Sequence, residues 1–228
     1  MLELLYLLNL LALGFILGLM HALDADHVAA VTAIASETKS IKKSSLLGLF
    51  WGLGHTATLL IAGILVLLLK ISIPEKLALS FEFLVGVVLV VLGIDVLRKT
   101  FMGKIHFHAH SHDGAEHIHI HSHKLSDSHD HAHKSFSVGA LHGLAGSAAL
   151  MLLVLATADS LFSGLLYILV FGLGSIVAML TISTIIGLPF RLTSNFSKAN
   201  GTIKLITGAA SIVLGVSIIY GVLPALLT

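Results

Sequence analysis

The sequence predicts an all-α integral membrane protein whose six transmembrane helices form a 3+3 inverted repeat, with the first helix kinked or broken. Three observations support this fold class. The 228 residues are 56% hydrophobic and only 11% charged, with a mean hydropathy of +1.00, whereas about 25% of the residues in soluble domains are charged. The apolar residues form stretches long enough to cross a bilayer. The two halves of the chain also share short motifs in the same order.

The composition excludes several classes of protein. The formal net charge of +1 gives no sign of nucleic-acid binding, and the chain has no cysteine. Disulfides, thiolate metal sites and thiol redox chemistry are therefore excluded, so a metal site must use His, Asp, Glu, Met, hydroxyl or backbone ligands. The apolar N-terminal stretch carries Glu3 and no basic segment, and we interpret it as a retained helix rather than a cleaved signal peptide.

Six segments are apolar enough to span a membrane, which requires about 20 residues of helix. They cover residues 4–35, 46–69, 78–97, 138–157, 160–187 and 203–226. These spans define a first three-helix membrane repeat at 1–97 and a second at 138–228, with a His-rich loop at 98–137 between them. A shorter polar loop at 188–202 contains Pro189.

The first of these segments is too long for one straight span. As a continuous helix, residues 4–35 would extend about 48 Å at 1.5 Å per residue, against a hydrocarbon core of about 30 Å. The polar stretch at 21–27 is the natural place for an interruption, since discontinuous helices coordinate ions in other membrane proteins. We therefore predict a kink or break there.

The two halves of the chain repeat in register. The matching segments, at offsets of 121, 120 and 122 residues, are Gly18–Leu23 with Gly139–Leu144, Phe50–His55 with Val170–Ser175, and Gly86 and Gly93 with Gly208 and Gly215. Each half contains three spans, an odd number, so the second half is inverted relative to the first. Inverted repeats with a site at their interface are typical of secondary transporters.

The basic residues predict the orientation of the chain. Eleven of the 13 Lys and Arg residues lie on the face that holds the loops 36–45, 98–137 and 188–204, and only Lys70 and Lys76 lie on the other face. Because cytoplasmic loops carry the excess of basic residues, we predict a multi-pass protein of the cell (cytoplasmic) membrane. Both termini are expected outside, and the His-rich loop in the cytoplasm.

Two imidazoles and two carboxylates occur within seven residues of an apolar segment: His21, Asp24, Asp26 and His27. Each charge near the bilayer centre costs roughly 2.5–3.5 kcal/mol, so such a cluster persists when its groups satisfy one another or bind something. On a regular helix Asp26 points away from the other three, unless the helix is broken. The alternatives are an ion-paired packing cluster, or polar residues at a helix end in water.

Two further histidines lie in apolar spans. His55 follows Gly52 and Gly54, whose lack of side chains lets another backbone approach. A lone histidine there could instead hydrogen-bond a neighbouring helix, and the same alternative holds for His142, but the repeat places His142 opposite His21. Three acidic residues near span ends are interpreted as solvated or structural: Glu82, Asp95 and Asp159.

These side chains together predict a site for a divalent transition-metal ion. Imidazole combined with carboxylate suits Ni²⁺, Co²⁺ or Zn²⁺ better than Ca²⁺ or Mg²⁺, which prefer shells of oxygen. The predicted ligands are His21, Asp24, Asp26, His27, His55 and His142.

The loop at 98–137 is predicted to be an accessory metal site. Neutral imidazole is the commonest metal ligand in proteins, and few large apolar residues are present to build a core. We expect this loop to be disordered without metal, and to buffer, sense or concentrate metal. The alternative is a tolerated low-complexity linker. Its eleven histidines are His106, His108, His110, His112, His117, His119, His121, His123, His129, His131 and His133.

The pattern His21-x4-Asp26-His27 resembles the signature of the nickel/cobalt transporter family, which carries it on an early transmembrane helix. The run Leu53-Gly54-His55-Thr56 resembles that family's Gly-His-Ser/Thr motif on the following helix. The similarity is clear over about residues 14–60 and weaker elsewhere. The resemblance implies that His21, Asp26, His27 and His55 are transport-site residues.

The chain also departs from that family pattern. Met20 stands where the family usually has Arg, and many members have eight spans rather than six. Later family motifs rich in Phe, Asp and Thr are replaced here by Leu141-His142-Gly143 and Ala158-Asp159-Ser160. The His-rich loop resembles the efflux branch of the wider group, which slightly favours efflux over uptake.

The resulting hypothesis is a secondary transporter, not an enzyme, that moves nickel or cobalt across the cytoplasmic membrane. The expected partners are the divalent ion as substrate and the lipid bilayer. We expect no nucleic acid and no cofactor beyond the transported nickel, cobalt or zinc, and the sequence carries no signal of oligomeric state. The alternatives are a zinc transporter, an intramembrane metalloenzyme (although HExxH is absent) and a metal sensor on a membrane anchor. Protons or the membrane potential are the expected drive, because ligands lose protons when they bind metal.

Overall fold

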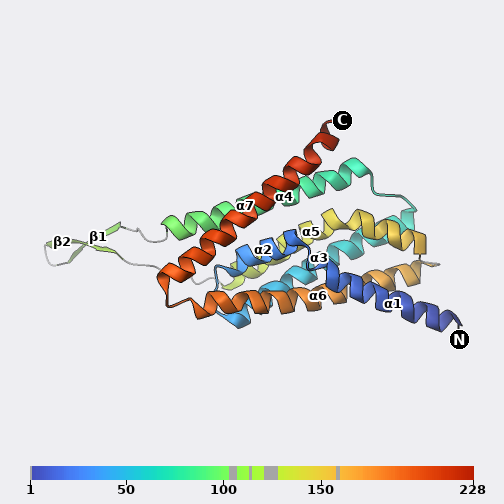
Figure 1. Ribbon diagram of the computed structural model, residues 1–228, viewed down its shortest axis with the longest axis horizontal. Coiled ribbons are helices and arrows are strands. Elements are labelled where there is room, and N and C mark those ends of the chain that lie inside the picture. Colours follow the sequence, from blue (N-terminus) through green and yellow to red (C-terminus); the bar gives the residue numbers. More distant parts are fainter. Residues whose placement is uncertain (1, 103–106, 113–114, 121–127, 158–159) are drawn as a thin grey trace.

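The computed structural model describes residues 2–102, 107–112, 115–120, 128–157 and 160–228. Within these ranges the membrane part is helical, and the two chain termini lie at the end opposite a small β hairpin (Figure 1). The elements are α1 (Leu2–His21), α2 (Ala25–Ala35), α3 (Ile41–Leu69), α4 (Glu75–Met102), β1 (Phe107–His112), β2 (Ala115–Ile120), α5 (Ser128–Thr157), α6 (Leu161–Leu192) and α7 (Ser197–Leu227).

Several of these helices are suited to crossing a bilayer. In the described part of the chain, α3, α4, α6 and α7 are each long and apolar enough, and the bent pair α1 and α2 makes a fifth candidate span. Helix α5 is a further helix of 30 residues. The prediction of a helical, multi-pass membrane protein is therefore confirmed, while the count of six spans and the inverted repeat stay predictions.

The predicted break in the first segment is confirmed. Helix α1 ends at His21 and α2 begins at Ala25, with a bend of 56° between them. The backbone N–H of Asp24 donates to the His21 carbonyl at 3.0 Å, which closes α1 with a tight turn. Asp24 itself has a ψ of 142°, which is outside the helical region. The backbone therefore changes direction at Asp24, from the axis of α1 to that of α2. The break lies in the polar stretch 21–27.

Several helices continue beyond the predicted spans. Helix α4 continues to Met102, α5 begins already at Ser128, and α6 passes Pro189 and ends at Leu192. The polar loops are thus shorter than the predicted 98–137 and 188–202. A helix need not end where the bilayer ends, because its backbone hydrogen bonds persist in water, and a proline in the last turn removes only one of them. The amide of Thr193 still donates to the Pro189 carbonyl at 3.0 Å.

The His-rich segment contains two strands, which the all-α prediction did not include. Strands β1 and β2 pair antiparallel, and the register sets His108 opposite His119 and His110 opposite His117. In this segment histidine occurs at every second residue, and successive side chains of a strand point to alternate faces with the same period of two. The pattern therefore gives this segment a tendency to form strands. Disorder of the loop without metal stays a prediction.

The helices pack closely at glycines, and the contacts of the two halves correspond. A side-chain carbon on Gly139 of α5 would overlap the carbonyl oxygen of Trp51 on α3, and one on Gly18 of α1 would overlap that of Phe171 on α6. These two contacts lie at the offsets of the sequence repeat. Small residues at such crossings are typical of membrane helix packing.

The same correspondence holds for the contact between α4 and α7, which lie side by side in Figure 1. A side-chain carbon on Gly86 would lie 2.9 Å from the Gly215 carbonyl oxygen, and one on Gly93 would lie 2.6 Å from that of Gly208. The glycine pairs found in the sequence therefore pack against each other across the two halves.

Helix α2 lies in the middle of the bundle and contacts α3, α4, α5, α6 and α7 (Figure 1). Three of its residues, Ala30, Val31 and Ala35, are fully buried. The residues just before this buried stretch, 24–27, therefore lie where α2 enters the bundle, with His27 buried. The break in the first segment thus becomes the place where the other helices meet.

Charged side chains join three elements at the end that carries the His-rich segment. The ammonium of Lys99 on α4 lies 2.7 Å from Glu37 and 2.9 Å from Asp95, and that of Lys134 on α5 lies 3.5 Å from Glu37 and 3.1 Å from Asp95. Glu37 lies two residues after the last residue of α2, Ala35. This four-residue set, the ion network, ties the end of α2 to α4 and α5.

Candidate metal centre

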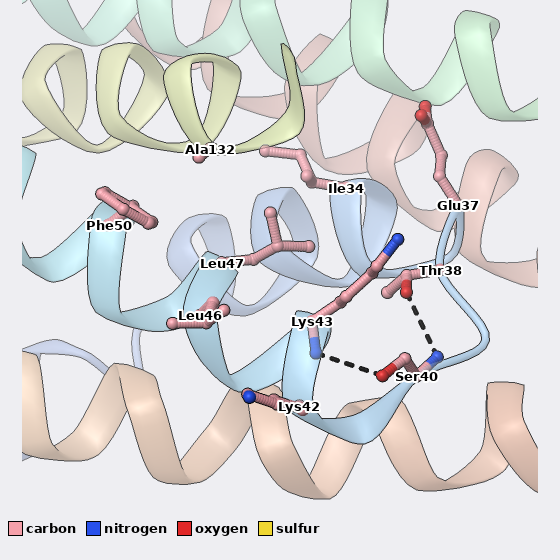
Figure 2. A pocket seen from close by; sticks show the side chains of 10 residues that line it. All are labelled: Ile34, Glu37, Thr38, Ser40, Lys42, Lys43, Leu46, Leu47, Phe50 and Ala132. Carbon is pink, nitrogen blue, oxygen red and sulfur yellow. Dashed lines mark hydrogen bonds between the residues drawn. The ribbon is translucent and has the colours of Figure 1, made fainter. Parts of the chain in front are cut away.

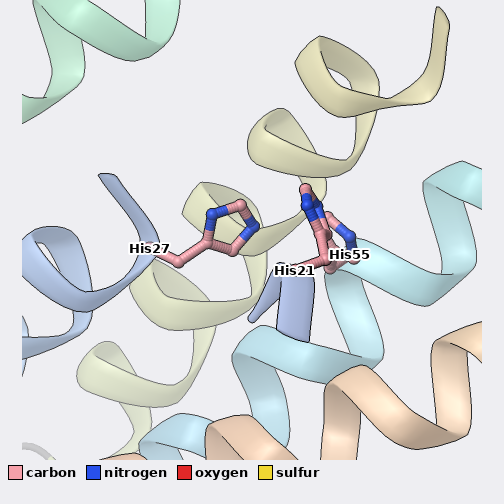
Figure 3. Close-up of side chains that lie close together, drawn as sticks. All are labelled: His21, His27 and His55. Carbon is pink, nitrogen blue, oxygen red and sulfur yellow. The ribbon is translucent and has the colours of Figure 1, made fainter. Parts of the chain in front are cut away.

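Four imidazoles from four helices meet at the break between α1 and α2. His21 ends α1, His27 lies in the first turn of α2, and His55 and His142 come from α3 and α5. The His27 ring centre lies 4.7 Å from that of His21, 5.2 Å from that of His55 and 5.1 Å from that of His142. Figure 3 shows three of these rings, with His27 directed toward His21 and His55.

Three of the imidazoles have their Nδ1 engaged by an acceptor. His21 Nδ1 lies 2.8 Å from an Asp24 carboxylate oxygen, and His27 Nδ1 lies 3.0 Å from an Asp26 oxygen. His142 Nδ1 lies 2.9 Å from the carbonyl oxygen of Val138. Carboxylates and carbonyls only accept, so in each neutral ring Nδ1 carries the proton and Nε2 keeps its lone pair. Metal-binding histidines almost always donate their other N–H in this way.

The remaining ring nitrogens are buried without partners. His27, His55 and His142 are at most 2% exposed. The Nε2 atoms of His27 and His142, and both ring nitrogens of His55, have no hydrogen-bond partner in the part of the chain that the structure describes. An unpaired buried polar atom is costly, about 1–3 kcal/mol, so several in one place indicate a bound ligand.

The separations suit one metal ion. His21, His27 and His55 each offer a ligand atom, and these atoms lie within 4.8 Å of one another. Atoms bound to one ion at about 2.1 Å lie at most about 4.2 Å apart, so small side-chain rotations would complete the site. His142 Nε2 lies 3.9 Å from a carboxylate oxygen of Asp26. This distance places His142 beside the other three histidines. A second set, Asp24, Asp26 and His27, meets the same limit of 4.8 Å.

A cavity of about 390 Å³ reaches these side chains. His21, Asp24, Asp26, His27 and His142 line it, together with parts of α4 and α7. His55 is not among its lining residues and lies fully buried behind them. The cavity lining is therefore polar and acidic at the histidines, which attracts a cation.

A second cavity, of about 340 Å³, lies near the His-rich segment, between the end of α2 and the first turns of α3 and α5. Lys42 and Lys43 line it, and Figure 2 shows the Lys43 side chain extending across it toward Glu37. Two ammonium groups repel a divalent cation. Of these two cavities, the one at the histidines is the candidate metal site.

The structure brings together all six predicted ligands of the membrane site. They differ in how far each side chain is exposed. Asp24 is half-exposed at the cavity, and Asp26 is 26% exposed and directed to His27. The break allows Asp26, which a regular helix would turn away, to join the histidines. Asp95, interpreted as structural, lies in the ion network.

Three residues near the histidines were not predicted to belong to the site. Glu82 was interpreted as solvated or structural, yet it lines the cavity. Trp51 and Phe171 contact the imidazole rings. Their place in the matching motifs of the two halves was the available signal, but an aromatic residue in a membrane span usually indicates packing alone.

The accessory histidines fall in several places. His106, His121, His123 and also Asp159 lie outside the described residues. His108, His110 and His112 are in β1, His117 and His119 are in β2, and His129, His131 and His133 are in the first turns of α5. Their role in metal binding stays a prediction.

Comparison with known proteins places the chain among membrane proteins. Residues 28–217 match the family described as the Cytochrome C biogenesis protein transmembrane region. Urease accessory protein UreH of Bacillus sp. (strain TB-90) is 42% identical over 214 residues, which cover 94% of this chain and 92% of that protein. No solved structure matches the chain.

Two more distant relatives cover less of their own length. Chloroplast protein FOR GROWTH AND FERTILITY 2 of Arabidopsis thaliana is 26% identical over 211 residues, covering 88% of this chain and 55% of that protein. A high-affinity nickel transport protein of Cupriavidus necator is 32% identical over 72 residues, which cover 31% of this chain and 20% of that protein.

These similarities agree with the sequence analysis. The resemblance to nickel transporters is confirmed by the Cupriavidus necator protein. Transport and accessory proteins as relatives are consistent with a non-enzymatic membrane protein, and not with the metalloenzyme alternative. The chain belongs to the Cytochrome C biogenesis protein transmembrane region family, with UreH as a relative along almost its whole length.

Proposed function

We propose that this protein is a secondary transporter that carries divalent nickel across the cell membrane. One observation carries the proposal: at a break in a membrane helix, three imidazoles whose Nδ1 atoms contact acceptors cluster with a fourth, fully buried imidazole. Such a set holds a divalent ion that accepts nitrogen ligands. The similarity to a nickel transport protein supports nickel as the ion. Cobalt and zinc are the competing substrates.

The histidines and the carboxylates have different tasks in this proposal. The Nε2 atoms of His21, His27 and His142, with one nitrogen of His55, bind the ion. Asp24 and Asp26 hold the rings of His21 and His27, and their negative charge offsets that of the ion. Asp24 is the more exposed of the two, and we place it at the entrance of the site.

The corresponding glycine contacts support a 3+3 inverted repeat. In that arrangement α1 with α2 corresponds to α5, α3 to α6, and α4 to α7. The contact of Gly139 with Trp51 then repeats that of Gly18 with Phe171. The histidines lie where the two halves meet, as in other transporters whose halves move against each other around a central site.

The position of the cavity supports access from one side. Its lining includes Glu82 near the start of α4 and Ile218 near the end of α7, both toward the end opposite the His-rich segment. The ion network lies at the other end. With the His-rich segment in the cytoplasm, as the basic residues predict, this conformation opens to the outside and the ion network closes the cytoplasmic side. The histidines of that segment would then meet the ion at the cytoplasmic mouth.

Transport is tested with purified protein in lipid vesicles. Radioactive nickel is placed inside or outside, under an imposed proton gradient or membrane potential, and flux is measured in both directions. We expect saturable nickel flux that unlabelled nickel inhibits most strongly, and cobalt and zinc less. Protein-containing vesicles that move no nickel under any of these gradients would contradict the proposal. The preferred direction is read from the same experiment.

The open side of the site can be tested with single cysteines, because the chain has none of its own. Ile218→Cys in the cavity is expected to react with a membrane-impermeant thiol reagent from the outside, and bound nickel should slow this reaction. Ala33→Cys, a buried position of α2 beyond the histidines, is expected to stay unlabelled. Labelling of Ile218→Cys from the cytoplasmic side alone would reverse the assignment.

The ion network is tested with the same probe. Asp95→Asn removes an acceptor of both Lys99 and Lys134, so the closed cytoplasmic side should be weakened and the protein should spend less time open to the outside. Labelling of Ile218→Cys should therefore slow. Lys198→Gln, at the same end but outside the ion network, is the control and should leave the rate unchanged. Equal rates with and without Asp95 would remove the gate assignment.

A further inference from the structure

Two large aromatic rings contact the imidazoles at the candidate site. The Trp51 ring centre lies 4.6 Å from that of His142, at an interplanar angle of 52°, and 6.0 Å from that of His27. The Phe171 ring centre lies 5.5 Å from that of His21, at 38°. These separations fall within the range of favourable ring contacts, 4.5–7 Å between centres. Both aromatic side chains are buried, Trp51 completely and Phe171 to 5% exposure.

The two contacts are equivalents in the two halves. Trp51 and Phe171 occupy matching positions of the repeated motif, and so do His142 and His21. Trp51 of the first half thus covers an imidazole of the second, and Phe171 of the second half covers one of the first. The backbone contact repeats as well: each carbonyl packs against the glycine three residues before that histidine, Gly139 or Gly18. In each half, the carbonyl contact and the ring contact therefore both hold the helix turn that carries the histidine.

We propose that Trp51 and Phe171 are a pair of positioning residues, which hold the His142 and His21 rings in the planes needed to bind the ion and keep water out of its shell. The inference rests on the proposed metal site and adds the residues that set its affinity and coordination geometry. Neither ring binds the ion. Each acts through the histidine that it covers.

The hydrogen-bond pattern explains why rings are needed. An Nδ1 hydrogen bond fixes one nitrogen of an imidazole but leaves the ring free to rotate about that bond. A flat neighbour at van der Waals distance removes this freedom. The indole N–H of Trp51 is buried and has no acceptor in the described part of the chain, so the ring rather than the polar group is what this position supplies. A purely structural role would require only a large apolar side chain.

The test compares leucine with phenylalanine at these positions. Purified full-length protein in detergent is titrated with Ni²⁺ alone, and the absorption spectrum of bound Co²⁺ reports the coordination geometry. Trp51→Leu and Phe171→Leu are expected to lower Ni²⁺ affinity by about 10–100-fold, the usual effect of losing a group that orients a ligand, and to shift the Co²⁺ bands. Trp51→Phe keeps a ring and should restore affinity and spectrum toward wild type.

Phe190→Leu is the matched control. Phe190 is another buried phenylalanine of α6, only 2% exposed, and lies outside the site. It should lose comparable packing but keep wild-type affinity and spectrum. Wild-type binding and spectra in both Trp51→Leu and Phe171→Leu would overturn the inference while leaving the metal site standing, as would an equal loss in Phe190→Leu. Wild-type protein that binds no Ni²⁺ would instead overturn the proposed function itself.

Discussion

Replacing His27 by alanine is expected to abolish nickel binding and transport while the protein stays folded. His27 is the central ring of the site, since three other imidazoles lie within 5.2 Å of it, measured between ring centres. Its Nε2 is buried without a partner in the described residues. The change removes a proposed nitrogen ligand, the ring that Asp26 contacts through Nδ1. Flux should fall to the level of empty vesicles.

Asp26→Asn gives a graded comparison. Asparagine has nearly the same shape and its carbonyl still accepts from His27 Nδ1, but the negative charge beside His27 and His142 is gone. If Asp26 orients a ligand rather than binding the ion, Ni²⁺ affinity should fall by about 10–100-fold instead of disappearing. A loss as complete as that of His27→Ala would make Asp26 a ligand.

The control for both variants is Glu75→Gln, which neutralises an exposed carboxylate at the start of α4, away from the cavity. It should leave nickel affinity and flux unchanged. Folding is checked by size-exclusion profile and thermal unfolding in detergent. Normal nickel flux in well-folded His27→Ala protein would remove the site assignment altogether.

Gly139→Ala is expected to destabilise the protein strongly, although alanine is the better helix former. The added carbon would lie 2.8 Å from the carbonyl carbon and 2.9 Å from the Cα of Trp51, closer than carbon atoms approach without bonding. These are backbone atoms, so α3 and α5 must move apart. Inserting a methyl group into a closely packed contact costs typically 1–3 kcal/mol. Because Trp51 and His142 flank this contact, nickel affinity should fall as well.

Gly201→Ala on α7 is the matched control. Apart from its own helix backbone and its chain neighbours, no group of the described residues lies within 4 Å of the position of the added carbon. The substitution therefore only exchanges glycine for alanine in a helix, which favours folding by about 1 kcal/mol. The two variants should therefore shift the midpoint of thermal unfolding in opposite directions. A rise in both would show that α3 and α5 have room at Gly139, and that the close contact does not limit stability.

Much of the fold follows from the sequence because its causes are local. Apolar length determines which segments are helices that can cross a bilayer, and the excessive length of residues 4–35 together with the polar stretch 21–27 predicts the break. The spacing of glycines predicts close helix crossings but not their partners. The predicted helix ends were less accurate, because hydropathy follows the apolar residues, whereas the helices continue past the apolar stretches to Met102 and Leu192.

The sequence by itself determined the class of protein, the break and the residue types of the candidate site. Side chains that are costly to bury must find partners, and that requirement can be recognised in a single segment. Tertiary structure alone decided which nitrogen of each imidazole is tied, that Asp26 turns to His27, that Glu82 reaches the cavity and that Trp51 and Phe171 cover rings of the opposite half. Those relations join helices far apart in the chain. Their directions depend on the bend and on the glycine contacts that bring the backbones together, and no local pattern encodes them.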